Sequence, residues 1–566
     1  MKKKINNSKR NQIGAQKNRT NFDLFNDDRF VYLLLGVAVL FVLTARIHLL
    51  SFPLERDEGE YAYMGRLILN GHLPYALAYN MKLPGTYYIY ALIMALFGQS
   101  TAGIHTGLML VAISSMLLVF SISKHFVSKA GAVIAAVSFG ILSTSGTLYA
   151  QAAHATHFVV FFALLGIKLL LRIYENKRGG ISRYYSAGFL FALAFICKQS
   201  GIFFWLFGLS LIIVKEYKPE SLPRLVRNAA VYFSGFITPV IIMLLYFRFF
   251  GDFGRFWFWT VKYLVKYGSN ISMAAVPGAF KEGLGAITAN YSAAGYTALW
   301  LLSLLGLPFM FANKKPKADK VLLSFAGFSF LTVVPGFYFR NHYFITLLPA
   351  AALSIAVFFD FFNGIFVHRL KLPGLVFASF AAFILLAGAG VKANAEYLFR
   401  QDNSLSCKQI YGANPFVESV EIADYLKNNT TADDKIAVLG SEPQILFYSD
   451  RYSATGYIYT YNLVELHSYA LAMQREMAGE IEASRPKFFV YVNIKTSWLF
   501  KPSSETYIFD WADGYVKKNY MLVARLDALP DKISRLKTGR EMQDFRPRSQ
   551  DVIYLFERIA PPGISP

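Results

Sequence analysis

Carboxylates gather in one short segment of this chain, LERDEGEY, which holds Glu55, Asp57, Glu58 and Glu60. A cluster of this kind can supply a general base that takes a proton from an attacking hydroxyl group. Acids also stabilise the positive end of a helix that begins at their position. Position alone leaves both interpretations open, and the scarcity of acids elsewhere in the apolar part of the chain favours a functional role.

Five further residues could bind an anion, and they come from three separate segments. Lys82 precedes a Pro-Gly turn in KLPG, Lys198 lies in CKQSG, and Arg340, His342 and Tyr343 lie in FRNHYF. If these segments lie at one depth of the same membrane face, their cationic groups can converge on a phosphate. The alternative for a lone lysine such as Lys82 is that its side chain extends toward the lipid headgroups.

Two histidines, His154 and His157, are three residues apart and could share a helix face. Zinc-binding histidines on one helix are usually four residues apart with a carboxylate nearby, and the chain has no H-E-x-x-H segment. A divalent metal with unknown ligands is therefore an alternative that the sequence leaves open. No other cofactor is indicated.

Long apolar runs must position these residues. The chain has 566 residues, of which 55% are hydrophobic and 16% charged, and a helix needs about 20 apolar residues to cross a bilayer. We predict a polytopic α-helical membrane domain at residues 30–392, after a basic cytoplasmic leader at 1–29, with a first extracytoplasmic loop at 51–104. About eleven spans are expected, near 30–50, 105–123, 130–149, 154–173, 184–197, 201–214, 229–250, 291–311, 321–337, 342–362 and 372–391.

Two amphipathic segments lie between these runs. DEGEYAYMGRLILNG, at 57–71, has apolar residues at helical spacing, so we expect a helix that lies in the membrane interface. GRFWFWTVKYLVKYG, at 254–268, has the aromatic composition of an interfacial belt, or of a lid over a site.

The basic residues indicate how the chain crosses the membrane. The leader and alternate loops hold 24 Lys and Arg, against 9 in the other set of loops. Because retained cytoplasmic loops carry the excess of Lys and Arg, the N-terminus is expected in the cytoplasm. An odd number of spans then places the C-terminal region outside, on the extracytoplasmic face of what we expect to be a bacterial inner membrane.

The composition changes near residue 393. Residues 1–392 carry a net charge of +23 and residues 393–566 a net charge of −2, so the basicity records membrane orientation and does not indicate a nucleic-acid partner. Short β-rich runs (KIAVLGS, KFFVYV, MLVARL, DVIYLFER) alternate with helical patterns in this region. They predict a soluble extracytoplasmic α/β domain at 393–566.

Several of these segments resemble the GT-C membrane glycosyltransferases. RDEGEYAYMGRLILNGHLPY after the first span, KLPG, LAFICKQSGIF and RNHYFITLLPA are similar in order and placement to family 39-like members. These are related to protein O-mannosyltransferases and the lipid A aminoarabinose transferase. The chain departs from the family pattern at Leu83, where members often have proline. It also departs in the second outside loop, which has Gln151, His154, Thr156 and His157 where members often have an acid.

The resemblance implies an inverting transferase that uses a sugar carried on a polyprenyl phosphate. The acceptor would be a lipid, a glycan or a protein at the extracytoplasmic face. The family's catalytic acid falls on Asp57, with Glu58 beside it as a second candidate, and its Lys-Pro lysine falls on Lys82. The donor phosphate would be bound by Lys82 and by four weaker assignments, Lys198, Arg340, His342 and Tyr343.

Two other classes of function remain as alternatives. A transporter or flippase of lipid-linked precursors would have ionisable residues near the bilayer midplane, whereas here they cluster at the outside ends of spans. A membrane-anchored binding or assembly protein would do its work through the C-terminal domain.

Overall fold

The computed structural model describes the chain in six stretches. The predicted leader, apart from its last three residues, and the first two residues of the predicted span at 291–311 lie outside them. The described residues are 27–175, 180–216, 221–288, 293–311, 316–372 and 374–559.

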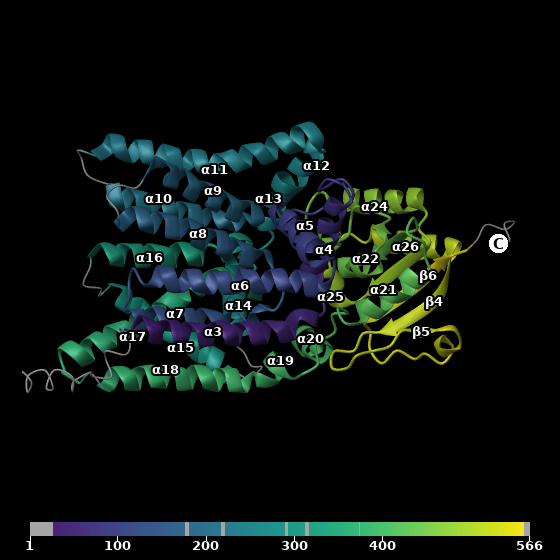
Figure 1. Cartoon of the computed structure of the whole chain (residues 1–566). Coiled ribbons are helices and arrows are strands. Elements are labelled where there is room, and N and C mark those ends of the chain that lie inside the picture. Colours follow the sequence, from purple (N-terminus) through teal and green to yellow (C-terminus); the bar gives the residue numbers. More distant parts are fainter. Residues whose placement is uncertain are drawn as a thin grey trace, which may run out of the picture.

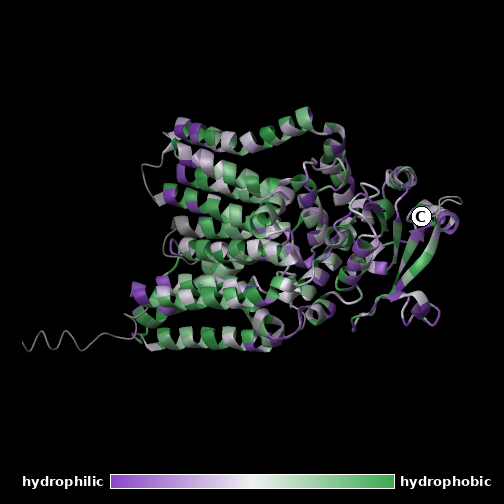
Figure 2. Cartoon of the chain, turned by 45° about the vertical axis from the view of Figure 1, so that its right-hand side comes forward, coloured by the Kyte–Doolittle hydropathy of each residue, from purple (hydrophilic) through white to green (hydrophobic). Residues whose placement is uncertain are grey.

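In the described part of the chain, long helices run side by side as a bundle, and the small C-terminal domain covers one end of it (Figure 1). Hydrophobic residues predominate along the bundle, whereas the C-terminal domain is more hydrophilic (Figure 2). The bundle helices are α3 (Asp28–His48), α6 (Thr101–Ser123), α7 (Lys129–Leu142), α8 (Ala155–Glu175), α9 (Ile181–Cys197), α10 (Ile202–Glu216), α11 (Leu222–Phe250), α15 (Ala293–Gly306), α16 (Pro316–Leu331), α17 (Leu348–His368) and α18 (Gly374–Ala393).

The protein is a multi-pass membrane protein. Seven helical segments of the described chain are long and apolar enough to cross a bilayer. Their outer surfaces expose large apolar side chains such as Phe249 and Leu385, as expected where lipid is the solvent. The four other predicted spans correspond to shorter apolar helices. One of them, α7, ends at Leu142 because the backbone turns through η2 (Gly146–Leu148) to Tyr149 at φ 52.

Short helices fill the junction between the bundle and the C-terminal domain (Figure 1). They are α4 (Arg56–Leu69), α5 (Gly85–Phe97), α12 (Phe253–Trp257), the π-helical turn η5 (Phe258–Tyr263), α13 (Leu264–Gly268), α19 (Ala395–Phe399) and α20 (Asn403–Tyr411). We expected α4 to lie in the membrane interface, but nearly all of its residues are buried by protein. It is enclosed because α5 packs on one side of it and α22 (Pro443–Ser449) of the C-terminal domain on another.

The C-terminal domain is a six-stranded mixed sheet with helices packed on it, which confirms the predicted α/β domain. The strand order is β2-β1-β3-β6-β4-β5, and β2, β1 and β3 are mutually parallel. The four predicted strand runs form β1 (Lys435–Leu439), β3 (Phe488–Asn493), β4 (Tyr520–Asp527) and β6 (Val552–Arg558), and the two-residue strands β2 (Tyr452–Ser453) and β5 (Lys537–Thr538) were not predicted. The larger helices are α21 (Glu418–Asn428), α24 (Ala470–Ser484) and α26 (Tyr507–Asn519).

The parallel part of the sheet directs three loops toward the bundle. Parallel strands end at the same edge of a sheet, so the chain leaves β1, β2 and β3 on one side. Residues just beyond these strands contact α4 or line the cavity described below. Among them are Ser441 and Glu442 after β1, Tyr459 after β2 and Thr496 after β3.

Close packing of α4 against α22 predicts a stability effect at Gly59. A Cβ atom at this position would lie 2.5 Å from the backbone nitrogen of Gln444. We expect Gly59→Ala to destabilise the protein by about 1–3 kcal/mol, because the backbone of α22 must move to admit the methyl group. Thermal unfolding in detergent would measure this. Gly479→Ala is the matched control, since nothing lies within 4 Å of its added Cβ on α24, and equal melting temperatures for the two variants would contradict the prediction.

Candidate active site

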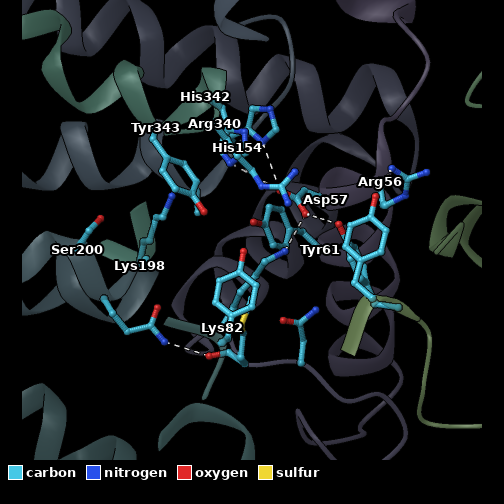
Figure 3. A pocket seen from close by; sticks show the side chains of 18 of the residues that line it. Arg56, Asp57, Tyr61, Lys82, His154, Lys198, Ser200, Arg340, His342 and Tyr343 are labelled. Atoms are coloured by element: carbon cyan, nitrogen blue, oxygen red, sulfur yellow. Dashed lines mark hydrogen bonds and ion pairs between the residues drawn. The ribbon is translucent and has the colours of Figure 1, made fainter. Parts of the chain in front are cut away.

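A cavity of about 500 Å³ lies at the junction of the bundle and the C-terminal domain. Its wall includes α4, the turn before α5, the connection between α7 and α8, the residues after α9, and the C-terminal loops. Figure 3 shows Asp57 near the centre of the lining side chains, with Lys82 below it and His154 and His342 above. Lys198 and Ser200 lie on the side opposite Arg56. Of the seven predicted site residues, six line this cavity: Asp57, Lys82, Lys198, Arg340, His342 and Tyr343.

Asp57 and Lys82 form an ion pair, and further hydrogen bonds hold both side chains in place. Lys82 Nζ lies 2.9 Å from Asp57 Oδ1 and 2.6 Å from Glu60 Oε2. Tyr87 donates a hydrogen bond of 2.7 Å to the other oxygen of Glu60, and Tyr459 donates one of 3.3 Å to Asp57 Oδ1. Asp57 Oδ1 is therefore occupied by protein donors, while Oδ2 accepts no hydrogen bond from the residues that the structure describes.

The electrostatics keep Asp57 ionised. Burial alone would raise the pKa of its carboxyl group, but the positive charge of Lys82, which also donates a hydrogen bond to it, holds that pKa well below its usual range. Burial also opposes the charge of Lys82, and the carboxylates of Asp57 and Glu60 outweigh it and raise the pKa of the ammonium group. The cavity thus contains a carboxylate that is charged at neutral pH.

Two histidines stand beside the free oxygen of Asp57. The rings of His154 and His342 are stacked, with centroids 4.1 Å apart and planes 13° from parallel. His154 Nδ1 lies 3.9 Å from Asp57 Oδ2, and His342 Nε2 lies 3.8 Å from the same atom. Burial lowers the pKa of His154 to about 4, so its ring is neutral at pH 7. His157, considered with His154 in the sequence, does not line the cavity.

Lys198 and Arg340 are cationic side chains without an acidic partner among the described residues. Lys198 Nζ lies 3.5 Å from the ring centroid of Tyr343, and the guanidinium carbon of Arg340 lies 5.5 Å from that of Tyr338. The Lys198 backbone is extended between α9 and the short helix η3 (Gln199–Gly201), which interrupts the helical path there. This wall of the cavity can therefore bind an anion.

Glu58, predicted as a second catalytic acid, does not line the cavity. Its Oε1 accepts hydrogen bonds of 2.6 Å from the Ala153 N–H group and of 3.0 Å from His105. It is fully buried and connects α4 to the bundle. Helix geometry separates the two acids, since adjacent residues differ by about 100° around the axis, whereas Glu60 and Tyr61 share a face with Asp57.

The C-terminal domain completes the cavity, and this contribution could not be predicted from the sequence. Arg56, next to Asp57, forms an ion pair of 2.6 Å with Glu442 and donates a hydrogen bond of 2.8 Å to the Tyr461 hydroxyl group. Glu465 lines the same wall and accepts a hydrogen bond of 2.5 Å from Tyr263 of η5. Residues 254–268, considered as a belt or a lid, thus contribute to the cavity wall through η5 and α13.

Comparisons with known proteins agree with this architecture. Residues 81–247 match the family model described as dolichyl-phosphate-mannose-protein mannosyltransferase. A search of curated protein sequences finds no match.

Solved structures of low sequence identity share the fold. ArnT from Cupriavidus metallidurans, bound to undecaprenyl phosphate, aligns with a TM-score of 0.59 and 12% identity, over 93% of this chain and 98% of that one. The archaeal oligosaccharyltransferase AglB from Archaeoglobus fulgidus, in complex with an inhibitory peptide and a dolichol-phosphate, aligns with a TM-score of 0.52 and 14% identity, over 90% of this chain and 74% of that one. The arabinofuranosyltransferase AftD from Mycobacteria aligns with a TM-score of 0.50 and 13% identity, over 94% of this chain and 40% of that one.

Proposed function

We propose that this chain, a multi-pass membrane protein with the GT-C glycosyltransferase fold, transfers a sugar from a polyprenyl phosphate to an acceptor hydroxyl group at the extracytoplasmic face. One observation carries the proposal: an ionised carboxylate, Asp57, shares a cavity with two cations, Lys198 and Arg340, that have no acidic partner among the described residues. The Asp57 carboxylate can accept a proton from a hydroxyl group, and the cations of Lys198 and Arg340 can bind a phosphate. The lipid phosphates in the AglB and ArnT structures support the choice of donor.

The proposed reaction transfers one proton to Asp57, forms one bond to the anomeric carbon and breaks the bond from that carbon to the phosphate oxygen. Asp57 Oδ2 accepts the proton of the acceptor hydroxyl group, whose oxygen attacks the anomeric carbon of the donor. The bond from that carbon to the phosphate oxygen breaks, and polyprenyl phosphate leaves with the electron pair. Lys198 and Arg340 stabilise the negative charge that develops on the phosphate. Attack from the face opposite the phosphate inverts the anomeric centre, as in other inverting sugar transfers.

Lys82 has a supporting role in this proposal. Its ammonium group donates a hydrogen bond to Asp57 Oδ1. This contact keeps the carboxylate charged and oriented, and it leaves Oδ2 available to accept a proton. Glu60 and Tyr87 in turn hold the ammonium group in place. Lys82 thereby positions the base, in addition to any contact with the donor phosphate.

The activity can be tested with purified protein in lipid vesicles. We expect transfer of radiolabelled sugar from a polyprenyl-phosphate donor to an extract of cell-envelope acceptors, with the anomeric configuration of the product inverted. Mass analysis of the glycans lost on deletion of the gene would supply the acceptor and the sugar. Movement of intact lipid-linked sugar across the vesicle membrane without transfer would overturn the proposal in favour of a flippase.

The pKa of Lys198 leads to a prediction for donor binding. Burial lowers this pKa to about 7, with the charges of Lys82 and Arg340 adding to the effect and that of Asp57 opposing it. Because the amine is charged only below this pH, affinity for the donor should fall as pH rises through 7, by up to about tenfold per unit. The measurement is the donor Kd between pH 6 and 9, with a phosphodiester donor whose own charge is constant over this range.

Lys198→Arg is the matched control for this pH dependence. A guanidinium group keeps its charge over the whole range, so the variant should show a nearly constant Kd. A wild-type Kd that is independent of pH, or one that changes equally in the variant, would contradict the assignment of Lys198 to the donor.

A further inference from the structure

We propose that Glu465 and Asn462 of the C-terminal domain bind hydroxyl groups of the sugar that the donor carries, and so determine which sugars the protein accepts. Both residues line the cavity, at the end of the short helix α23 (Tyr461–Val464). The inference rests on the proposed function and adds the chemical class of the sugar to it. That class is a sugar with free hydroxyl groups and no negative charge.

Both side chains have hydrogen-bond acceptors that the described residues leave unused. Tyr263 of η5 donates a hydrogen bond of 2.5 Å to Glu465 Oε2, whereas Oε1 accepts none from the part of the chain that the structure describes. Asn462 is 7% exposed, and its Oδ1 has no hydrogen-bond partner among the same residues. Buried polar groups are nearly always partnered, and the hydroxyl groups of a sugar are donors that would provide the partners.

The backbone that carries these two side chains is fixed without a ligand. Three consecutive carbonyl oxygens, those of residues 462, 463 and 464, each accept a hydrogen bond from a side chain of the C-terminal domain. The donors are His467 Nε2 at 2.8 Å, Gln474 Nε2 at 2.8 Å and Ser504 Oγ at 2.5 Å, in that order. Because the segment is already ordered, a ligand that binds there pays little for loop ordering.

The position of Arg340 indicates that the sugar at this wall belongs to the donor. Burial raises the pKa of Glu465, and the hydrogen bond from Tyr263 and the positive charge of Arg340 oppose this rise. Glu465 and Arg340 thus interact across the cavity that both of them line. Since the proposed function assigns Arg340 to the donor phosphate, the sugar joined to that phosphate comes next to Glu465.

The chemistry of this wall defines the class of sugar. Trp259, Tyr263 and Tyr267 line the same cavity, and aromatic side chains give a binding pocket apolar surface for the carbon skeleton of a ligand. A carboxylate accepts hydrogen bonds from hydroxyl groups, but it repels a second carboxylate, and such like-charge contacts exclude wrong partners. Neutral hexoses and pentoses therefore fit this wall, and uronic acids do not.

The test compares donors that share a phosphodiester charge and differ in the sugar. The full-length protein in detergent would be titrated calorimetrically with polyprenyl methyl phosphate, which has no sugar, and with polyprenyl phosphates that carry mannose, glucose, xylose or galacturonic acid. The ratio of the Kd without sugar to the Kd with sugar is the sugar-dependent affinity gain. We expect a gain for at least one neutral sugar in the wild type, and none for galacturonic acid.

Glu465→Ala should lower the gain for the neutral sugar by at least about tenfold, because hydrogen bonds to a charged group are lost. Glu465→Gln should lower it less, and this variant should bind the galacturonic acid donor more tightly than the wild type does, because the like-charge repulsion is gone. A purely structural role would not produce this opposite change. If the melting temperature shows that Glu465→Ala does not fold, Glu465→Gln alone decides the outcome.

Glu482→Gln is the matched control. The Glu482 carboxylate also accepts a hydrogen bond from an aromatic side chain, 2.6 Å from Trp511 Nε1, but it is exposed and does not line the cavity. This variant should bind every donor as the wild type does.

Three results would overturn the inference: no gain for any neutral sugar in the wild type, a gain that is unchanged in both Glu465 variants, or a defect confined to the KM of the acceptor. The inference and the proposed function can fail independently. Transfer by Glu465→Ala with the wild-type kcat/KM would overturn the sugar contact and leave the proposed function standing. A gain that depends on Glu465, with no transfer to any acceptor, would do the reverse.

Discussion

Asp57→Asn should abolish most sugar transfer while leaving the protein folded. An amide of the same shape cannot accept the proton of the acceptor hydroxyl group, and the loss of a general base typically lowers a rate by about 10²–10⁴-fold. Lys82 keeps its contact of 2.6 Å with Glu60 in this variant, so the cavity wall should persist. The measurement is the initial rate of transfer in vesicles at saturating donor, with the melting temperature as a check of folding.

Glu58→Gln is the matched control for this experiment. It removes one negative charge at the adjacent position, where the carboxylate accepts hydrogen bonds from Ala153 and His105 and does not line the cavity. A glutamine oxygen can still accept the bond from Ala153, so transfer should stay close to the wild-type rate. An equal loss of transfer in both variants, or wild-type transfer by Asp57→Asn, would contradict the assignment of the base.

Arg56→Met should have the largest effect on stability. Arg56 and Glu442 are both buried and form an ion pair of 2.6 Å that joins α4 to the C-terminal domain. Removing the cation leaves the Glu442 carboxylate buried without a charge partner, which typically costs about 3–5 kcal/mol. Because Asp57 is the next residue, the rate of transfer should fall as well. Thermal or chemical unfolding in detergent would measure the change in stability.

The double variant Arg56→Met with Glu442→Leu separates the two parts of this effect. Replacing a buried ion pair by apolar side chains of similar size is often neutral or stabilising. We therefore expect the double variant to regain most of the stability that the single variant loses. A double variant that is no more stable than Arg56→Met would show that the ion pair does not account for the effect.

Local patterns in the sequence were sufficient for the membrane architecture and for part of the site. The length of an apolar run depends only on neighbouring residues, so the sequence indicated the bundle helices. Two of these helices end earlier than predicted, because the chain turns after Leu142 and after Leu331. Asp57 and Lys82 stand in short motifs at the outer ends of spans. The same local information led us to predict a catalytic role for Glu58. The sequence shows that Asp57 and Glu58 are adjacent, but it does not show which of the two side chains faces a cavity.

The functional groups are brought together by contacts between residues far apart in the chain, and these contacts could not be predicted from the sequence. The approach of His154 and His342 to Asp57 depends on how α4, the start of α8 and η9 pack at one end of the bundle. Tyr459 reaches Asp57 because the parallel strands of the C-terminal domain end at the edge that faces α4. Run lengths, charges and short motifs determined by themselves that this is a membrane protein with reactive groups at one face. Only tertiary packing decided which of those groups share a cavity, because their contacts join residues that are hundreds of positions apart.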